Sequence, residues 1–236
     1  MLKKFQLKKM EVENKNRQAV VVYGDSDFAE QVYYQLESDG RYEVLAFTVD
    51  EQFLRKAAFM GLPLIPFQQL HEKYSAKEVL VFPAIGYSKL NTIRERVVLE
   101  IEQAGYRLLT YISKLAYIGA NTKIGEGCYI CEFVSIGINS VIGKATIFLP
   151  NSRIGHHNCI EDYCYFSNSV SIGGHAILKR NCFIGMHATI RNSIQIGSFN
   201  VIGTAGNVVQ STEPNGIYVG NPAKRLKEVD LNTLKF

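Results

Sequence analysis

The sequence predicts two parts, a small α/β domain and an all-β stack of short repeats that follows it. Apolar residues recur at every sixth position from residue 118 to residue 208, without a break in register. Upstream, a strand, a glycine turn, a helix and a second strand follow one another, an order typical of a βαβ unit. The sixteen apolar positions are Ile118, Ile124, Ile130, Ile136, Ile142, Phe148, Ile154, Ile160, Phe166, Ile172, Leu178, Ile184, Ile190, Ile196, Ile202 and Val208.

A period of six is not helical, because one apolar residue in six makes a poor stripe on a helix. It fits a short strand followed by a turn, with the large apolar residue pointing inward. Glycine often comes next, where it allows the backbone to turn at little steric cost. The residue four positions after the apolar one is usually small. One hexad cannot bury its own apolar residue, so we expect neighbouring repeats to stack on one another.

The region before the repeats is predicted to be a small Rossmann-like parallel sheet over residues 18–112. Helices are expected to begin at Phe28 and at Asn91, and Gly105 is expected to stop the second one near Gln103. Strands are expected at residues 19–23, 42–50, 78–86 and 106–112.

The turn after the first strand is a candidate nucleotide site. It runs Gly-Asp-Ser-Asp-Phe-Ala from Gly24 and lacks the G-x-G-x-x-G fingerprint, so NAD is not expected. Gly24 can still present backbone N–H groups to a phosphate at the start of a helix. Asp50 ends the next strand, where an acidic residue often meets a ribose. The alternative is that Gly24 forms only a tight turn and that Asp27 caps the helix.

Composition and charge exclude several classes of protein. The formal net charge is +4, and the first seventeen residues alone account for it, so the remaining chain is neutral and no nucleic-acid partner is expected. A run of about 18 apolar residues is absent, so we expect no membrane span. The N-terminus has no signal-peptide core. The five cysteines have no metal-ligand spacing, which favours a cytoplasmic protein.

The repeat resembles the hexapeptide-repeat, left-handed parallel β-helix of bacterial acyltransferases. Together with the α/β domain it resembles the sugar acetyltransferases of the sialic-acid and bacillosamine type. Three segments carry the likeness, residues 84–94, 155–163 and 218–226. The resemblance implies that three hexads form one coil, that acetyl-CoA is the acyl donor, that the enzyme is a homotrimer and that the first domain holds a nucleotide sugar. Its matching positions are Ser26, Asp27, Phe28, Asp50 and Gly86, beside Gly24.

The histidines of the repeat differ in hexad position. His157, His175 and His187 stand at position four, where other hexads have asparagine, and both residue types are enriched in left-handed backbone conformations. We interpret these three as corner residues. His156 stands at position three and should project outward, where a histidine suits proton transfer. The resemblance makes His156 the catalytic histidine. The family often has glutamate next, here replaced by His157, so Asp162 or Glu161 is the candidate that orients the ring.

The resemblance also places the cofactor on the coils after His156. Tyr165 replaces a second family histidine near CoA. Gly174 is eighteen residues after His156 and is expected to leave room for pantetheine. Met186 and Thr204 match CoA-contacting positions, although Met186 could equally be a subunit contact. Lys224 and Arg225 could meet the CoA phosphates, or belong to a solvated cap.

The predicted domains are a basic extension over 1–17, the nucleotide-sugar-binding domain over 18–112, the β-helix over 113–210 and a C-terminal cap over 211–236. The predicted function is N-acetylation of a nucleotide-linked amino sugar, a precursor of a surface glycan such as lipopolysaccharide. An O-acetyltransferase, a non-catalytic scaffold and a zinc carbonic anhydrase are the alternatives. Zinc needs three convergent ligands, and we expect the adjacent His156 and His157 to point in different directions, so no metal is predicted. Exposed Phe133, Ile138 and Phe199 are expected to meet a partner.

Overall fold

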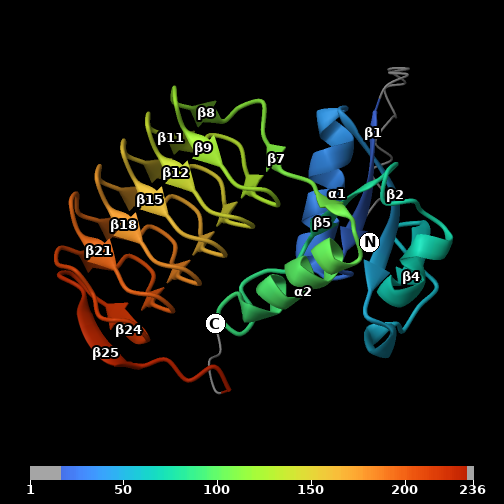
Figure 1. Cartoon of the computed structure of the whole chain (residues 1–236). Coiled ribbons are helices and arrows are strands. Elements are labelled where there is room, and N and C mark those ends of the chain that lie inside the picture. The colour runs from blue at the N-terminus through green and yellow to red at the C-terminus, as the bar shows by residue number, and fades with distance from the viewer. Residues whose placement is uncertain (1–16, 233–236) are drawn as a thin grey trace, which may run out of the picture.

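The computed structural model describes residues 17–232, so the predicted extension over 1–17 lies almost wholly outside the described residues. An α/β domain and a three-sided β-helix stand side by side, and α2 (Thr92–Gln103) lies between them (Figure 1). None of the helices within residues 17–232 is long and apolar enough to span a bilayer.

The first domain is a mostly parallel six-stranded sheet in the order β3-β4-β2-β1-β5-β6, in which only β3 and β4 are antiparallel. Two short 3-10 helices, Glu51–Phe53 and Phe67–Glu72, precede and follow the β3–β4 hairpin. The strands are β1 (Gln18–Tyr23), β2 (Tyr42–Val49), β3 (Ala58–Phe59), β4 (Leu62–Pro66), β5 (Leu80–Pro83) and β6 (Arg107–Leu108).

The two helices cover opposite faces of this sheet. The first, α1 (Asp27–Asp39), packs Val32 and Leu36 with Val20 and Val22 of β1, whereas α2 packs against the face of Val21. This alternation follows from the period of two along a strand. The chain turns to the opposite side of β1 when it enters β5, so the crevice beyond the carboxyl ends of β1 and β5 is the switch point at which such sheets bind ligands.

The strand predicted over residues 106–112 is two strands that belong to different sheets. β6 pairs with β5 in the first domain, and β7 (Tyr111–Ile112) pairs with β10 of the β-helix. Leu109 N–H still donates to Val81 O, and Tyr111 N–H already donates to Cys128 O. The prediction of one continuous strand is therefore wrong, because the chain changes sheet within two residues.

The β-helix consists of three parallel sheets, in which residues eighteen apart pair in register, for example Arg153 with Ser171. Residues 205, 199 and every sixth position back to 121 have a positive φ, which confirms the corner interpretation of His157, His175 and His187. The strands are β8 (Tyr117–Ile118), β9 (Lys123–Ile124), β10 (Tyr129–Ile130), β11 (Ser135–Ile136), β12 (Val141–Ile142), β13 (Ile147–Phe148), β14 (Arg153–Ile154), β15 (Cys159–Ile160), β16 (Tyr165–Phe166), β17 (Ser171–Ile172), β18 (Ile177–Leu178), β19 (Phe183–Ile184), β20 (Thr189–Ile190), β21 (Gln195–Ile196), β22 (Val201–Ile202) and β23 (Asn207–Val208).

The coil interior is filled by the repeated apolar residue. Phe148 and Phe166 stack with ring centroids 4.5 Å apart, and Cys164 is buried at the small position. At the far end, β24 (Gly216–Val219) continues the eight-stranded sheet and β25 (Lys224–Glu228) pairs with it antiparallel. Phe133 and Ile138 are exposed, whereas Phe199 is partly buried against the core; the contact of all three with a partner stays a prediction.

Arg94 of α2 joins the two domains. It is fully buried, and its guanidinium donates five hydrogen bonds to backbone carbonyls on both sides of the domain boundary. The acceptors are the carbonyl oxygens of Ile85, Gly86, Ala145, Tyr163 and Cys164, at 2.6 to 3.3 Å. Burial lowers the pKa of Arg94 to about 10, so the guanidinium is still charged at neutral pH.

Candidate active site

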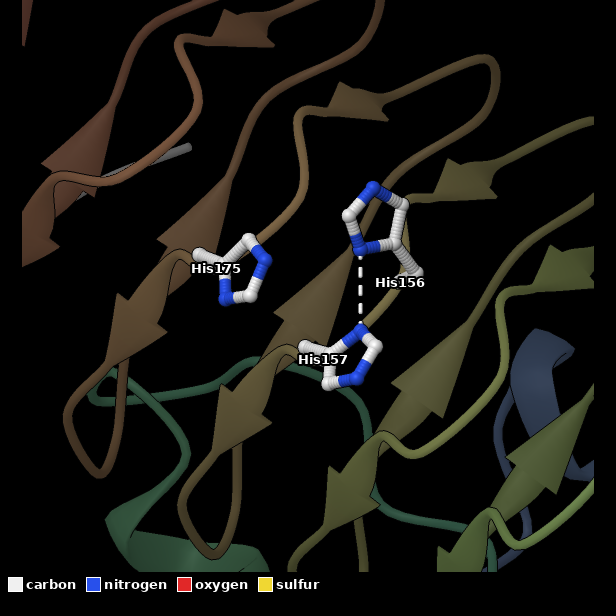
Figure 2. Close-up of side chains that lie close together, drawn as sticks. All are labelled: His156, His157 and His175. Atoms are coloured by element: carbon white, nitrogen blue, oxygen red, sulfur yellow. Dashed lines mark hydrogen bonds between the residues drawn. The ribbon is translucent and has the colours of Figure 1, made fainter.

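Three histidines converge on one corner of the β-helix, where the chain turns from the sheet of β14 and β17 into the sheet of β15 and β18 (Figure 2). The rings of His157 and His175 stack with centroids 4.9 Å apart, and the ring of His156 stands nearly perpendicular to both at 5.1 Å. The Nδ1 atoms of His156 and His157 lie 3.0 Å apart. The expectation that these two side chains point in different directions is therefore wrong.

A chain of polar contacts continues from His156 through His157 to Asn139. The Asn139 side-chain amide lies 3.1 Å from His157 Nε2. Both histidine contacts leave the proton positions open, since an imidazole has two tautomers and an amide two orientations. If Asn139 accepts from His157 Nε2–H, then His157 Nδ1 accepts from His156 Nδ1–H. His156 Nε2 then carries its lone pair outward, as a proton acceptor requires.

Gly174 lies directly against the His156 ring. A Cβ on Gly174 would come 2.8 Å from His156 Cε1 and 2.9 Å from His156 Nε2. The imidazole of His156 thus lies over Gly174, and the contact of Gly174 with pantetheine stays a prediction. This glycine is what allows the ring of His156 to lie over the next coil.

The carboxylates predicted to orient His156 have other partners. Asp162 Oδ1 accepts from the backbone N–H of Lys144 at 2.7 Å, and Glu161 pairs with Lys179 Nζ at 2.7 Å and with the Arg180 backbone N–H at 3.1 Å. Both lie in the next turn of the coil, between β15 and β16. Among the described residues, His157 rather than Asp162 contacts His156. The catalytic role of Asp162 stays a prediction.

Tyr165 is a packing residue between the two domains. Its side chain is only 5% exposed, it stacks on Phe183, and the Tyr87 ring meets it edge-on at 5.0 Å. Burial raises the pKa of Tyr165 to about 12. It packs against the first domain, and its contact with CoA stays a prediction.

The remaining predicted cofactor residues are at the surface, away from the histidine corner. Met186 and Thr204 are exposed and stacked one coil apart, in the turn from the sheet of β19 and β22 into that of β20 and β23. Lys224 and Arg225 lie on exposed β25, where Arg225 also donates to Pro214 O at 3.4 Å. The face formed by β17, β20 and β23 separates Met186 and Thr204 from His156.

The predicted nucleotide residues gather at the switch point of the first sheet. Gly24 follows β1 with φ +132°, and a Cβ there would come 2.9 Å from Ala84 O, so glycine lets the two loops approach closely. Ser26 caps α1 through its backbone, and Asp27 opens the helix; both are exposed. Gly86 follows β5 and accepts Arg94 Nη1 at 2.6 Å.

Asp50 is part of a buried polar network. It is 5% exposed, Tyr23 O–H donates to its Oδ1, and Arg96 Nη2 donates to its Oδ2 at 2.9 Å. Burial and the bond to Asp50 raise the pKa of Tyr23 well above its usual value. Both carboxylate oxygens already have partners, and these bonds hold the Asp50 side chain in place at the end of β2, where a ribose contact is predicted.

No protein-family model matches the chain, but solved structures match nearly its whole length. A variant of perosamine N-acetyltransferase from Caulobacter crescentus, in complex with CoA and GDP-perosamine, aligns with a TM-score of 0.80 and 22% identity over 89% of this chain and 97% of its own. The acetyltransferase domain of PglB from Neisseria gonorrhoeae, in complex with acetyl coenzyme A, aligns at 0.79 and 20% identity over 89% and 100%. WeeI from Acinetobacter baumannii aligns at 0.79 and 25% identity over 88% and 99%.

The chain has the fold of the hexapeptide-repeat sugar acetyltransferases. The predicted fold class, a Rossmann-like domain followed by a left-handed parallel β-helix, is confirmed, and so is the resemblance on which it was based.

The spacing of eighteen residues predicts that His175 stacks on His157 of the adjacent coil, and the structure confirms this contact. The contacts of Arg94 were missed. Arg94 was not singled out, although it shares one helical face with Val97, Val98 and Ile101. A charged residue on an apolar helix face was the signal that could have identified the interdomain contact.

Proposed function

We propose that this protein is an acetyl-CoA-dependent N-acetyltransferase that acts on a nucleotide-linked amino sugar, with His156 as the general base. One observation carries the proposal: the exposed ring of His156 lies over Gly174, and its Nδ1 is in hydrogen-bond contact with His157 Nδ1. Within residues 17–232, no hydrogen bond engages His156 Nε2. The two-domain fold shared with a structure that contains both CoA and GDP-perosamine supports the choice of substrates.

The reaction needs one proton acceptor. The sugar amine attacks the thioester carbonyl, a C–N bond forms, the C–S bond breaks and the amine loses a proton. His156 Nε2 accepts this proton and returns it to the departing thiolate, so CoA leaves as the thiol. If the Asn139 amide turns its oxygen toward His157 Nε2–H, each partner in the chain from Asn139 through His157 accepts a hydrogen bond. The chain then stabilises the imidazolium that forms on His156.

The oxyanion that develops on the carbonyl requires a preorganised donor. The backbone N–H of Gly174 is the candidate. It lies one coil from His156, and among the described residues it makes no hydrogen bond, whereas the corresponding N–H groups of Lys144 and Arg180 are held by carboxylates. An N–H group fixed in the coil would need no rearrangement during the reaction.

The nucleotide end of the substrate is proposed to bind at Gly24, Ser26, Asp27 and Gly86, beyond the carboxyl ends of β1 and β5. The N-terminus of α1 supplies backbone donors for a phosphate. Asp27 opposes a phosphate unless its side chain turns away. Asp50 is proposed to reach the ribose while it keeps its bonds to Tyr23 and Arg96.

We further propose a homotrimer in which CoA lies between neighbouring copies. His156 and the pair Met186 and Thr204 lie at different corners, so one CoA that touches both sets is best held by two subunits. Exposed Val141, Cys159 and Ile177 form an apolar strip on the five-stranded sheet beside the histidine corner. Lys224 and Arg225 would then meet the CoA phosphates.

The enzyme is proposed to be cytoplasmic and to supply an acetylated sugar for a surface glycan such as lipopolysaccharide. The cysteines of residues 17–232 are all free thiols, which suits a reducing compartment.

Thiol release from acetyl-CoA tests the proposal. Purified protein is supplied with a panel of UDP-, dTDP- and GDP-linked 3-amino and 4-amino sugars, beside the His156→Ala variant. We expect release with one amino sugar and a loss of about 10²–10⁴ in kcat in the variant. Release that His156→Ala leaves unchanged would disprove the assignment of the base. Release only with a hydroxyl sugar would favour an O-acetyltransferase, the alternative that the same geometry allows.

A further inference from the structure

The histidine corner holds more nitrogen ligands than a general base and its orienting neighbour require. His175 contacts both other rings but lies outside the chain that runs from His156 through His157 to Asn139. Among the residues that the structure describes, these three histidines are the group whose potential metal-ligand atoms converge, all within 4.8 Å of one another. We propose that His156, His157 and His175 bind a divalent transition-metal ion such as Zn²⁺, and that the bound ion blocks acetyl transfer.

The spacing of the three rings suits such an ion. Zinc binds histidine nitrogen at about 2.0–2.1 Å, so tetrahedral ligands lie about 3.3 Å apart. One nitrogen pair already lies 3.0 Å apart, and all three histidines are exposed. Imidazole is a ligand that Zn²⁺, Ni²⁺ and Cu²⁺ share, and three protein ligands leave a fourth position for water.

The backbone beneath the cluster is rigid before any ion arrives. His157 and His175 are corner residues with φ of 57° and 58°. The N–H of His157 donates to Ile138 O, and that of His175 donates to His156 O, both at 2.9 Å. The three ligands therefore lie on two adjacent coils that regular backbone hydrogen bonds hold in place, so binding an ion needs only side-chain rotation.

Asn139 supplies the outer contact that metal-bound histidines usually have. Such a histidine typically donates its second ring N–H to an oxygen, which fixes the ring orientation. Asn139 lies 3.1 Å from His157 Nε2, the nitrogen opposite the one that faces His156. With its carbonyl oxygen toward the ring, the amide accepts this N–H and leaves His157 Nδ1 for the ion.

The inhibitory half of the inference rests on the proposed function. If the ion binds His156 Nε2, the proton acceptor is occupied. If it binds Nδ1 instead, the neutral ring must carry its proton on Nε2. Either way His156 can no longer accept a proton from the sugar amine, so metal binding and general-base catalysis exclude each other.

The binding half is tested by calorimetric titration of untagged full-length protein with Zn²⁺ in a non-chelating buffer near pH 7.5. We expect one saturable site per chain. His175→Asn keeps a residue suited to the left-handed corner but removes one ligand. Loss of even an outer contact of a ligand costs about 10–100-fold in affinity, so we expect at least about 100-fold weaker binding. His187→Asn, an identical substitution at a corner outside the cluster, should bind like the wild type.

Thiol release then tests inhibition. Saturating Zn²⁺ should stop turnover of the wild type and of His187→Asn, and a chelator should restore it. His175→Asn, compared with its own metal-free rate, should keep most of that rate at the Zn²⁺ concentration that stops the wild type. Absence of a saturable site in the wild type, or equal affinity in His175→Asn, overturns the metal site. Tight binding without inhibition overturns the second half. A wild type inactive with every acceptor refutes the proposed function, while the titration still decides whether the ion binds.

Discussion

Gly174 lies directly beneath the imidazole ring of His156, which leaves no room for a side chain at this position. We expect Gly174→Ala to displace the His156 ring, because the new Cβ would come 2.8 Å from His156 Cε1. A misplacement of about 1 Å can lower catalysis about 10²-fold. Thiol release and thermal unfolding measure this together, and kcat should fall while the midpoint stays near that of the wild type. A fully active Gly174→Ala would show that the observed ring position is not the catalytic one.

In the proposed mechanism Asn139 acts on His156 only through His157, as a positioning residue. We expect Asn139→Gly, which tolerates the left-handed corner, to lower kcat about tenfold with little change in KM, because an imidazole in the wrong tautomer is a poor base. Asn139→Asp should restore activity and move the rise of the pH–rate profile to higher pH, because a carboxylate stabilises a protonated relay. If neither variant changes the profile, the contact with His157 at 3.1 Å has no role in proton transfer.

For single residues, the sequence predicted the position within the hexad better than it predicted which side chains are in contact. Position three placed His156 outward and position four placed His157 and His175 at left-handed corners, since both follow from one period. The partner of His156 could not be predicted, because ring orientation depends on side-chain rotation about a surface corner. The burial of Tyr165 could not be predicted for a related reason, since it depends on Tyr87 of the other domain.

Helix α2 contributes stability through one charged side chain. Arg94→Met would leave the carbonyls of Gly86, Ala145 and Tyr163 without this donor in a buried contact. Each unsatisfied buried acceptor costs about 1–3 kcal/mol, so we expect the free energy of unfolding to fall by about 3 kcal/mol or more.

Denaturant unfolding followed by circular dichroism measures this loss. Arg191→Met, at an exposed position of the coil, is the matched control and should stay within about 0.5 kcal/mol of the wild type. Equal stability of the two variants would show that water replaces the guanidinium without cost.

Elements with a strong period were predictable and irregular ones were not. The repeat fixed the short strands of the β-helix within a residue. The segment from Glu51 to Glu72, with its hairpin and two 3-10 helices, carries no period and was not predicted. The change of sheet between β6 and β7 was also not predicted, because residues 106–112 contain no glycine or proline that would mark a break between two strands.

For the whole molecule, buried tyrosines predict a loss of stability at alkaline pH. Burial raises the pKa of both Tyr163 and Tyr165 from 10.0 to about 12. Above pH 10 the unfolded chain releases these protons while the folded chain keeps them, so the unfolded state binds fewer protons and the free energy of unfolding falls as pH rises. Below pH 10 this contribution is fully present.

Melting temperatures between pH 8 and pH 11.5 test this dependence. Tyr165→Phe removes one of the two ionising groups and should lose less stability above pH 10 than the wild type, relative to their values at pH 8. Parallel curves for the two proteins would mean that Tyr165 ionises equally easily in both states.

The hydrogen bonds of Arg94 limit where the β-helix can gain or lose coils. The carbonyls that it holds in the coil belong to Ala145, Tyr163 and Cys164, which bracket the turn of His156 along the chain. Because Arg94 binds carbonyls of both domains, this one side chain sets the distance between the proposed nucleotide crevice and the histidine corner. Coils added or removed outside this bracket would lengthen or shorten the molecule without altering that separation.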